Sequence, residues 1–239
     1  MAQTWHELLF AHWPIPVTAL RPLIPEPLSV DTFEGQAWLG VIPFRMSGVR
    51  MRATPALPWL SAFPELNVRT YVTAGDKPGV WFFSLDAANA VAVAVARAWF
   101  HLPYFRARMR SRARAGWIEY ESERPCEPRA IPAYLALRYR PQGGEFEPVA
   151  GTLVHWLTER YCLYALDPRG GLYRGEIHHA PWRLRDAQAE FAERNTMARV
   201  HGLELPPVAP LLHFAECQQV AIWAPQKIGD GGRAAGDAP

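Results

Sequence analysis

Residues 66–87 read LNVRTYVTAGDKPGVWFFSLDA and predict the kind of fold that the chain adopts. The segments 66–74 and 79–87 are rich in β-branched and aromatic residues, which favour strands. Between them, GDKP at 75–78 consists of residues that favour a tight turn. The stretch therefore predicts an antiparallel β-hairpin, and we expect Lys77 to be solvated in its turn.

The rest of the chain predicts more short strands. Its 239 residues include 23 prolines, which disfavour long helices. A strand at 36–46 is interrupted by Pro43, which implies a sheet edge or a bulge there. We expect 88–100 to be a short helix or a buried strand, and 151–166 to start as a helix on Thr152 and finish extended. Other expected elements are strands at 135–140, 172–179 and 211–223, and a surface helix at 186–200 that Gly202 closes.

Arginine occupies every second position from Arg106 to Arg114. A strand places all five of these side chains on one face, and the next segment offers Glu119, Glu121 and Glu123 at the same period. An antiparallel partner strand with cross-strand Arg–Glu pairs is therefore expected. We interpret the arginines as a solvated strand face and not as a nucleic-acid site, because no aromatic residues for base stacking alternate with them.

Composition bounds the class of protein. The length suits one domain, expected over 1–228, with a disordered Gly/Ala/Asp tail at 229–239. The formal charge of +2 does not indicate a polyanion-binding protein. The three cysteines are widely spaced and indicate neither a disulfide framework nor a zinc ribbon, and no segment has a signal-peptide or membrane-span pattern. We expect a cytoplasmic protein with no nucleic-acid or membrane partner, no metal and no cofactor, which could form a homo-oligomer.

Two segments combine titratable and aromatic side chains. HLPYF, from His101 to Phe105, is either a set of core aromatics with a satisfied histidine or the wall of a pocket. EIHHAPW, from Glu176 to Trp182, is either a pocket rim or a structural cluster that pairs with neighbouring arginines. In LTERY at 157–161, we expect either Glu159 or Arg160 to turn inward and the other to face solvent.

Seven distinctive segments extend from Trp5 to about Trp182; they are LLFAHWP, DTFEGQAWLGVIPF, NVRTYV, GVWFFSLDA, ARAWFHLPYF, LTERYCLY and IHHAPWRL. In these segments the chain resembles the YqjF-like bacterial proteins, a domain of unknown function grouped with the acetoacetate decarboxylase-like superfamily. The resemblance implies an α+β, β-rich fold, in which an antiparallel cone or barrel-like sheet with a few helices encloses a ligand cavity.

In ALRPLIPEPLSVD at 19–31 and VARAWFHLPYF at 95–105, the chain more distantly resembles the decarboxylases themselves, but the resemblance does not extend to their chemistry. Tyr104 and Phe105 stand where those enzymes have two lysines, one of which forms an imine with the substrate. The chain has only two lysines, Lys77 in the predicted turn and Lys227 beside the tail. One pocket glutamate is retained as Glu65, and the other falls near Gly40. Acetoacetate decarboxylase activity is therefore not expected.

Three functions stay open at this point. The first is a binding protein for a small organic acid or an aromatic ligand, the second is a lysine-independent acid–base enzyme (lyase, isomerase or hydrolase), and the third is a structural or interaction protein. The sequence does not identify catalytic residues. The candidate pocket residues are Glu65, Arg69, Arg97, His101, Tyr104, His178, His179 and Trp182.

Overall fold

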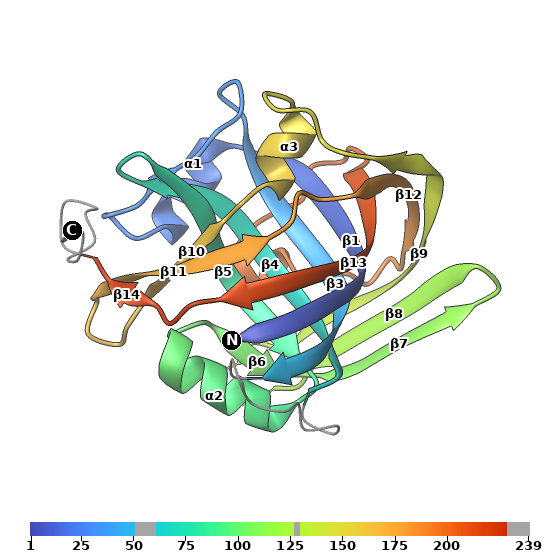
Figure 1. Cartoon of the computed structure of the whole chain (residues 1–239), viewed down its shortest axis with the longest axis horizontal. Helices are drawn as coiled ribbons and strands as arrows, with labels where there is room; N and C mark the ends of the chain where they lie inside the picture. The colour runs from blue at the N-terminus through green and yellow to red at the C-terminus, as the bar shows by residue number, and fades with distance from the viewer. Residues whose placement is uncertain (51–60, 127–129, 229–239) are drawn as a thin grey trace.

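The fold was analysed in a computed structural model, which describes residues 1–50, 61–126 and 130–228 (Figure 1). The tail predicted at 229–239 lies outside these residues. The strands are β1 (Ala2–Ile15), β2 (Ser29–Val30), β3 (Ala37–Arg50), β4 (Phe63–Ala74), β5 (Lys77–Ala87), β6 (Tyr104–Arg106), β7 (Arg108–Arg114), β8 (Trp117–Arg124), β9 (Ala133–Phe146), β10 (Cys162–Leu166), β11 (Leu172–His179), β12 (Leu184–Phe191), β13 (Leu211–Ile222) and β14 (Gln226–Lys227). The helices are α1 (Val17–Leu20), α2 (Ala90–Phe100) and α3 (Leu153–Thr158), with 3₁₀ turns η1 (Arg21–Leu23) and η2 (Arg199–His201).

The predicted hairpin is present as β4 and β5, which pair from Glu65/Ala87 to Ala74/Lys77 around a two-residue turn. It lies in the middle of one continuous sheet of order β14-β11-β10-β5-β4-β3-β1-β13-β12-β9-β8-β7. An additional pairing of β11 with β13 closes seven of these strands into a barrel-like ring. The expected β-rich, barrel-like fold is therefore confirmed.

The two faces of the ring have different roles, and the period of two along β4 separates them. Leu66 and Val68 point outward into a core that lies between the ring and strands β8 and β9. The alternate residues Glu65, Asn67 and Arg69 line a cavity inside the ring. A register slip of one residue would exchange these two sets, so the buried apolar outer face fixes which polar residues point inward.

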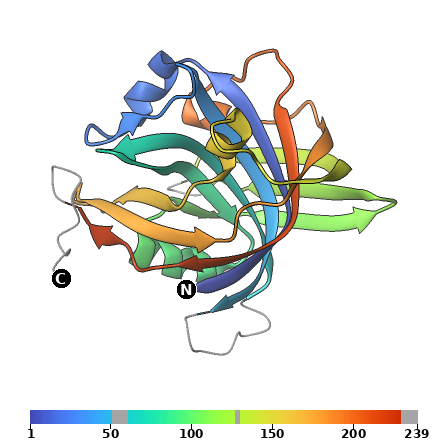
Figure 2. The same ribbon diagram turned by 45° about the horizontal axis from the view of Figure 1, so that its top comes forward.

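Strands β7, β8, β9 and β12 extend the sheet beyond the ring, and the β7–β8 hairpin projects from the body (Figures 1 and 2). The predicted Arg–Glu ladder is confirmed for three arginines: Arg108, Arg110 and Arg112 lie opposite Glu123, Glu121 and Glu119. The prediction of one strand for all five arginines is wrong, because Arg106 belongs to β6, which pairs with β5. All three arginines of the ladder are exposed. The basic stripe is a solvated face with acidic cross-strand neighbours.

The predicted surface helix at 186–200 is wrong. Residues 184–191 form β12, in which Ala187, Ala189 and Phe191 pack on the core while Gln188 and Glu190 bond to arginines of β9. This period of two satisfies both faces of a strand, and it overrides the helix propensity of Ala, Gln and Glu. Gly202, at a φ of 74°, closes only the short turn η2.

Two local predictions are confirmed. The pairing of β1 with β3 is irregular between His6/Arg45 and Ala11/Val41, an interval that contains Pro43, so the proline coincides with a bulge. The side chain of Thr152 accepts a hydrogen bond from the backbone of His155 and caps α3, after which β10 is extended. No helix within the described residues is long and apolar enough to span a membrane.

Candidate functional site

An interior cavity of about 50 Å³ lies inside the ring, among β1, β4, β5, β11 and the segment that follows α3. Because a cavity needs about 15 Å³ to hold one water molecule, this cavity has room for roughly three. One part of its wall is apolar, formed by residues such as Phe82, Leu85 and Leu163. The remaining wall is polar and is formed by Gln3, Trp5, Glu65, Asn67, Arg69, Tyr104, Thr158, Arg160, His179 and Trp182.

Glu65 and Tyr104 form a hydrogen-bonded pair in this wall. The Tyr104 hydroxyl donates to Glu65 Oε2 over 2.9 Å, and Glu65 is only 3% exposed. Burial, opposed by the Tyr104 hydrogen bond and assisted by the charge of Asp86, raises the pKa of Glu65 to about 8. Burial also raises the pKa of Tyr104 well above its usual value. Near neutral pH, therefore, Glu65 is mostly protonated and supplies little negative charge to the cavity.

Arg69 is a buried cation without a counterion in the described part of the chain. The residue is 8% exposed, Nη2 donates one long hydrogen bond of 3.4 Å to the Leu157 carbonyl, and Nε has no partner among the described residues. Gly40, opposite Arg69 on β3, makes room for this arrangement, because a Cβ there would lie 3.4 Å from Arg69 Cγ and 3.1 Å from the His12 ring. The fold thus accommodates a charged group that no carboxylate of the described residues neutralises.

Arg160, which lines the same cavity, is held differently. Its Nη1 donates to Asp31 Oδ2 over 2.6 Å and its Nε to the Trp156 carbonyl over 2.6 Å, whereas Nη2 has no partner. The guanidinium carbon of Arg160 lies 4.9 Å from the Tyr71 ring centroid, and that of Arg69 lies 5.7 Å from it. Two cations thus lie over one aromatic ring, and only one of them has a carboxylate partner within the described residues.

A hydrogen-bonded chain beneath the cavity holds Tyr71 in place. The Tyr71 hydroxyl donates to the Leu157 carbonyl over 2.8 Å and lies 2.7 Å from His12 Nε2. Because the hydroxyl proton is used on Leu157, Nε2 must donate and His12 carries its proton there. Burial, reinforced by the charge of Arg69, lowers the pKa of His12 well below its usual value and keeps the ring neutral.

Unsatisfied polar atoms gather at this cavity. Three buried nitrogens that could donate a hydrogen bond, and one oxygen that could accept one, lack partners and belong to lining residues: Arg69 Nε, Arg160 Nη2, Trp5 Nε1 and Asn67 Oδ1. Buried polar groups in proteins are nearly always hydrogen-bonded, so each exception needs an explanation. Three of the four are donors, so the group that each of these three lacks is a hydrogen-bond acceptor.

Five of the eight candidate residues line the cavity, namely Glu65, Arg69, Tyr104, His179 and Trp182. His179 Nδ1 lies 2.8 Å from the Ala180 carbonyl, and burial lowers its pKa. Trp182 Nε1 donates to the Thr158 carbonyl over 2.9 Å. These two aromatic side chains, 5.0 Å apart, form a firmly held part of the wall.

The other three candidates lie away from the cavity. Arg97 is exposed on α2, where Nε donates to the Tyr104 carbonyl. His101 ends α2 in the left-handed region and packs on Tyr173, with ring centroids 4.8 Å apart. His178 points to the opposite side of β11 from His179, because neighbouring residues of a strand alternate, and it is exposed beside Trp223.

Sequence reasoning did not commit to Arg160, Asn67 or Trp5. For Arg160 the signal was LTERY, from which one inward residue was expected: Arg160 is buried, and Glu159 is half-buried, with Oε1 accepting from the Trp182 backbone N–H over 2.9 Å. Asn67 and Trp5 could not be predicted as cavity residues, because they lie on β4 and β1, which face the same cavity only in the folded ring. Within the described residues, no group of three or more His, Cys, Asp or Glu side chains could hold a metal ion.

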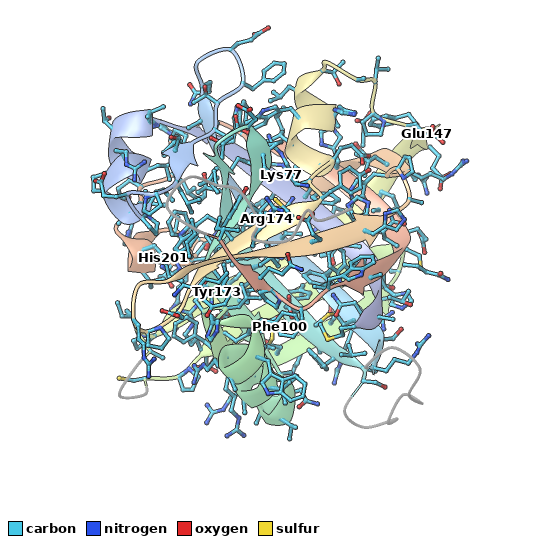
Figure 3. The ribbon with its side chains drawn as sticks, turned by 60° about the vertical axis from the view of Figure 1, so that its left-hand side comes forward. Lys77, Phe100, Glu147, Tyr173, Arg174 and His201 are labelled. Carbon is cyan, nitrogen blue, oxygen red and sulfur yellow. The ribbon has the colours of Figure 1, made fainter. Side chains whose placement is uncertain are left out.

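Neither lysine lines the cavity. Lys77 Nζ pairs with Glu176 over 3.2 Å, and Arg174 Nε pairs with the same carboxylate over 2.8 Å. Figure 3 shows Lys77 and Arg174 close together on this side of the sheet. Lys227 is exposed in β14. EIHHAPW is therefore both a structural cluster and part of the pocket, because Glu176 pairs with cations while His179 and Trp182 form cavity wall.

Comparison with known proteins places the chain in a family. The profile of the DUF2071 family, described as an uncharacterized conserved protein, matches residues 2–219. The chain belongs to the DUF2071 family. A curated relative of this DUF2071 protein is the uncharacterized protein YqjF of Bacillus subtilis (strain 168), which is 48% identical over 227 residues, or 95% of this chain and 92% of YqjF.

Solved structures extend the likeness at the level of the fold. The DUF2071 chain superposes on the enduracididine biosynthesis enzyme MppR in a HEPES-bound structure with a TM-score of 0.66 and 12% identity, covering 96% of this chain and 88% of MppR. Its TM-score with the acetoacetate decarboxylase of Legionella pneumophila subsp. pneumophila str. Philadelphia 1 is 0.63 at 11% identity, covering 95% and 87% of the two chains. The DUF2071 protein therefore has an acetoacetate decarboxylase-like fold.

Proposed function

We propose that this DUF2071 protein binds a small monocarboxylic acid in the cavity, with the carboxylate on Arg69. The observation that carries the proposal is the burial of Arg69 with an unpartnered Nε and no carboxylate within ion-pair distance in the described residues. Leaving a buried charge unpaired is costly, so such groups normally have an opposite charge beside them. A bound anion would supply that charge.

The charges of the residues around the cavity favour a ligand that carries one negative charge. Asp31 neutralises Arg160, and Glu65 is mostly protonated because its pKa is raised to about 8. Arg69 is then the single uncompensated charge among these groups. Arg69 Nε, Arg160 Nη2 and Trp5 Nε1 supply donors, which suits a carboxylate, an acceptor with two oxygens.

Cavity size supports a small acid over a large aromatic one. A volume of about 50 Å³ matches a ligand of a few non-hydrogen atoms, and the apolar wall of Phe82, Leu85 and Leu163 suits a short organic tail. MppR, which shares only the fold with this chain, has been solved in complex with pyruvate. Pyruvate is therefore a reasonable member of a test panel.

The test is thermal stabilisation by matched ligands. Acetate, propionate, pyruvate, lactate and benzoate would be compared with acetamide and propionamide, their uncharged counterparts, in wild type and in Arg69→Met. We expect stabilisation by one or more small carboxylates in the wild type only. Equal stabilisation by the amides, or an undiminished response in Arg69→Met, would refute the proposal.

A second candidate function is acid–base catalysis on the same ligand, as a lyase, isomerase or hydrolase. It is favoured by the Glu65–Tyr104 pair, since a carboxylic acid with a pKa near 8 can donate and accept a proton around neutral pH. If the bound acid is turned over, Glu65→Gln should abolish turnover while the affinity for the acid stays measurable. Turnover that survives Glu65→Gln would remove this candidate.

A further inference from the structure

The ring is closed between β11 and β13 by a short contact. Only residues 177–179 of β11 pair with β13, at residues 220–222. After His179 the chain turns away toward β12, which pairs with β13 again only at residues 213–214 (Figure 1). Within the described part of the chain, this edge of β13 therefore has no partner strand at residues 215–219. The ring wall has an opening in its hydrogen-bonded backbone there.

A glutamine side chain closes this opening. Gln218 faces the interior of the ring, because it lies opposite Trp5, a residue of the cavity wall. Its Nε2 donates to the Ala180 carbonyl over 2.6 Å and lies 3.4 Å from His179 Nδ1. Gln218 is only 9% exposed, so its amide is part of the wall and not of the surface. An uncharged side chain thus joins β13 to the segment that leaves it.

An outer groove of about 720 Å³ reaches the cavity at this place. It is lined by residues from the end of β11, from β13 and from the start of β1. Gln3 and His179 line both this groove and the interior cavity, and Gln218 lines the groove. Where the two hollows share a residue, the wall between them is one side chain thick. A ligand of the cavity has to cross the ring wall, and the wall is thin here.

A second outer groove also shares a residue with the cavity, but it suits an acid less well. This groove, of about 420 Å³, shares Arg160, which is fixed by its 2.6 Å contacts with Asp31 and the Trp156 carbonyl. Three carboxylates line it, those of Asp31, Asp76 and Glu159. An anion would meet negative charge in this groove, and opening the wall would break a mostly buried ion pair.

The groove beside Gln218 has the opposite character. Arg50 supplies a positive charge to its lining, and no carboxylate is among the described residues that line it. Displacing Gln218 from the Ala180 carbonyl breaks a hydrogen bond between uncharged groups, which is weaker than a charge-assisted one. The charge of the groove and the strength of its closure therefore both favour this route for an anion.

We propose that a small acid enters and leaves the cavity between β11 and β13, with Gln218 as the gate. This inference rests on the proposed function and adds the route by which the ligand reaches Arg69. The Gln218 side chain swings away from the Ala180 carbonyl, and the ligand passes between Gln3 and His179. Gln218 then controls the rates of binding and release, whereas Arg69 determines the affinity.

Removing the gate tests its role. Stopped-flow mixing with pyruvate or acetate can be followed by the fluorescence of Trp5 and Trp182, which line the cavity. In Gln218→Ala, the association and dissociation rate constants should rise together, each at least about fivefold, while Kd changes less than about twofold. Gln219→Ala is the matched control, because Gln219 is exposed on the outer face of the same strand, and both rate constants should stay unchanged. Rate constants that are the same in Gln218→Ala and wild type would contradict the gate.

A thiol that is already present gives an independent test of the route. Cys217 is exposed and lines the groove, whereas Cys162 is buried. In Cys126→Ser protein, a bulky maleimide on Cys217 should slow the association of pyruvate at least about tenfold. The control carries the same maleimide in the acidic groove, in Cys126→Ser, Cys217→Ser, Asp76→Cys protein, and its rate should be unchanged. Slowing by the label at position 76 and not by the label on Cys217 would place the entrance in the acidic groove.

Failure of the entrance and failure of the proposed function give different results. If no carboxylate stabilises the wild type or changes its fluorescence, no acid is bound, and both proposals are refuted. If an acid binds in an Arg69-dependent way, but its rate constants do not respond to Gln218→Ala or to the label on Cys217, the proposed function stands and the entrance is refuted.

Discussion

Replacing Arg69 with methionine should make the protein more stable and remove its capacity to bind a carboxylate. Methionine has a similar length, so it can fill the same space without the charge. The wild-type arginine is buried with an unpartnered Nε and one 3.4 Å hydrogen bond. Removing such a group recovers about 1–3 kcal/mol of desolvation free energy. Weak contacts with the Phe10 and Tyr71 rings, at 5.8 and 5.7 Å, are lost in exchange.

The net gain should be up to about 2 kcal/mol, since the two lost cation–π contacts lie near the outer limit of about 6 Å and contribute about 0.5 kcal/mol each. For a protein of this size, that corresponds to a rise in Tm of up to about 8 °C. Denaturant unfolding and calorimetry in the absence of ligand measure both quantities, and titration with the carboxylate panel measures the loss of binding.

Arg160→Met is the matched control, because it changes the other arginine of the same cavity. Arg160 is paired with Asp31 at 2.6 Å, so its removal leaves a carboxylate without its partner. We expect a loss of about 2–4 kcal/mol, somewhat below the cost of breaking a fully buried pair. A higher free energy of unfolding in Arg69→Met and a lower one in Arg160→Met would support the reasoning. Destabilisation of Arg69→Met by as much as Arg160→Met would refute it, because Arg69 would then have a partner that we have not identified.

Four further predictions test other parts of the structure. The folded-state pKa of Glu65 is raised from 4.5 to about 8, so between these pH values the folded state binds more protons than the unfolded state. The free energy of unfolding should therefore fall as pH rises, by up to about 1.4 kcal/mol per pH unit. Glu65→Gln should flatten this slope between pH 6.5 and 8 in unfolding titrations, and an unchanged slope would contradict the assignment. Arg124→Ala should lower the free energy of unfolding by about 3–5 kcal/mol, because it breaks the buried ion pair with Asp86 at 2.5 Å. Arg108→Ala removes the exposed 3.9 Å pair with Glu123 and should lower it by less than about 1 kcal/mol. Equal losses in denaturant unfolding would contradict this prediction. Gly79→Ala should destabilise the β5–β10 contact, since the new Cβ would meet Cys162 Sγ at 2.6 Å and the Cys162 carbonyl oxygen at 2.9 Å, and a neutral Tm would show that the backbone can shift. Borohydride trapping with pyruvate or a β-keto acid should label neither Lys77 nor Lys227, as peptide mass mapping would show; stoichiometric labelling of either would restore imine chemistry to consideration.

Local sequence patterns were sufficient to predict most of the strands. The hairpin of β4 and β5 follows from two β-rich segments around GDKP, and the β7–β8 ladder follows from arginines and glutamates at a period of two. The pattern failed at β12, where alanine and glutamate propensity favoured a helix but burial of Ala187, Ala189 and Phe191 on one face required a strand. The neighbouring strands determine the conformation of this segment, and a single sequence does not show which strands those are.

The cavity was predictable only in part, for a similar reason. Glu65, Arg69 and Tyr104 were found through their segments and through the family resemblance, and all three line the cavity. What the sequence could not show is that, among the described residues, Arg69 has no counterion whereas Arg160 has Asp31, because that difference depends on where Asp31 lies after folding. The exposure of Val91, Val95 and Trp99 on α2 could not be predicted either, because an apolar sequence is typical of a buried helix until its environment is known.

The central claim is that Arg69 binds the carboxylate of a small acid, and a crystal structure at high resolution with pyruvate or acetate tests it most directly. We predict a carboxylate in the cavity with an oxygen about 2.7–3.2 Å from Arg69 Nε. Arg69 paired with Glu65 or another carboxylate of the protein, in a cavity that contains only water at saturating acid, would contradict the account.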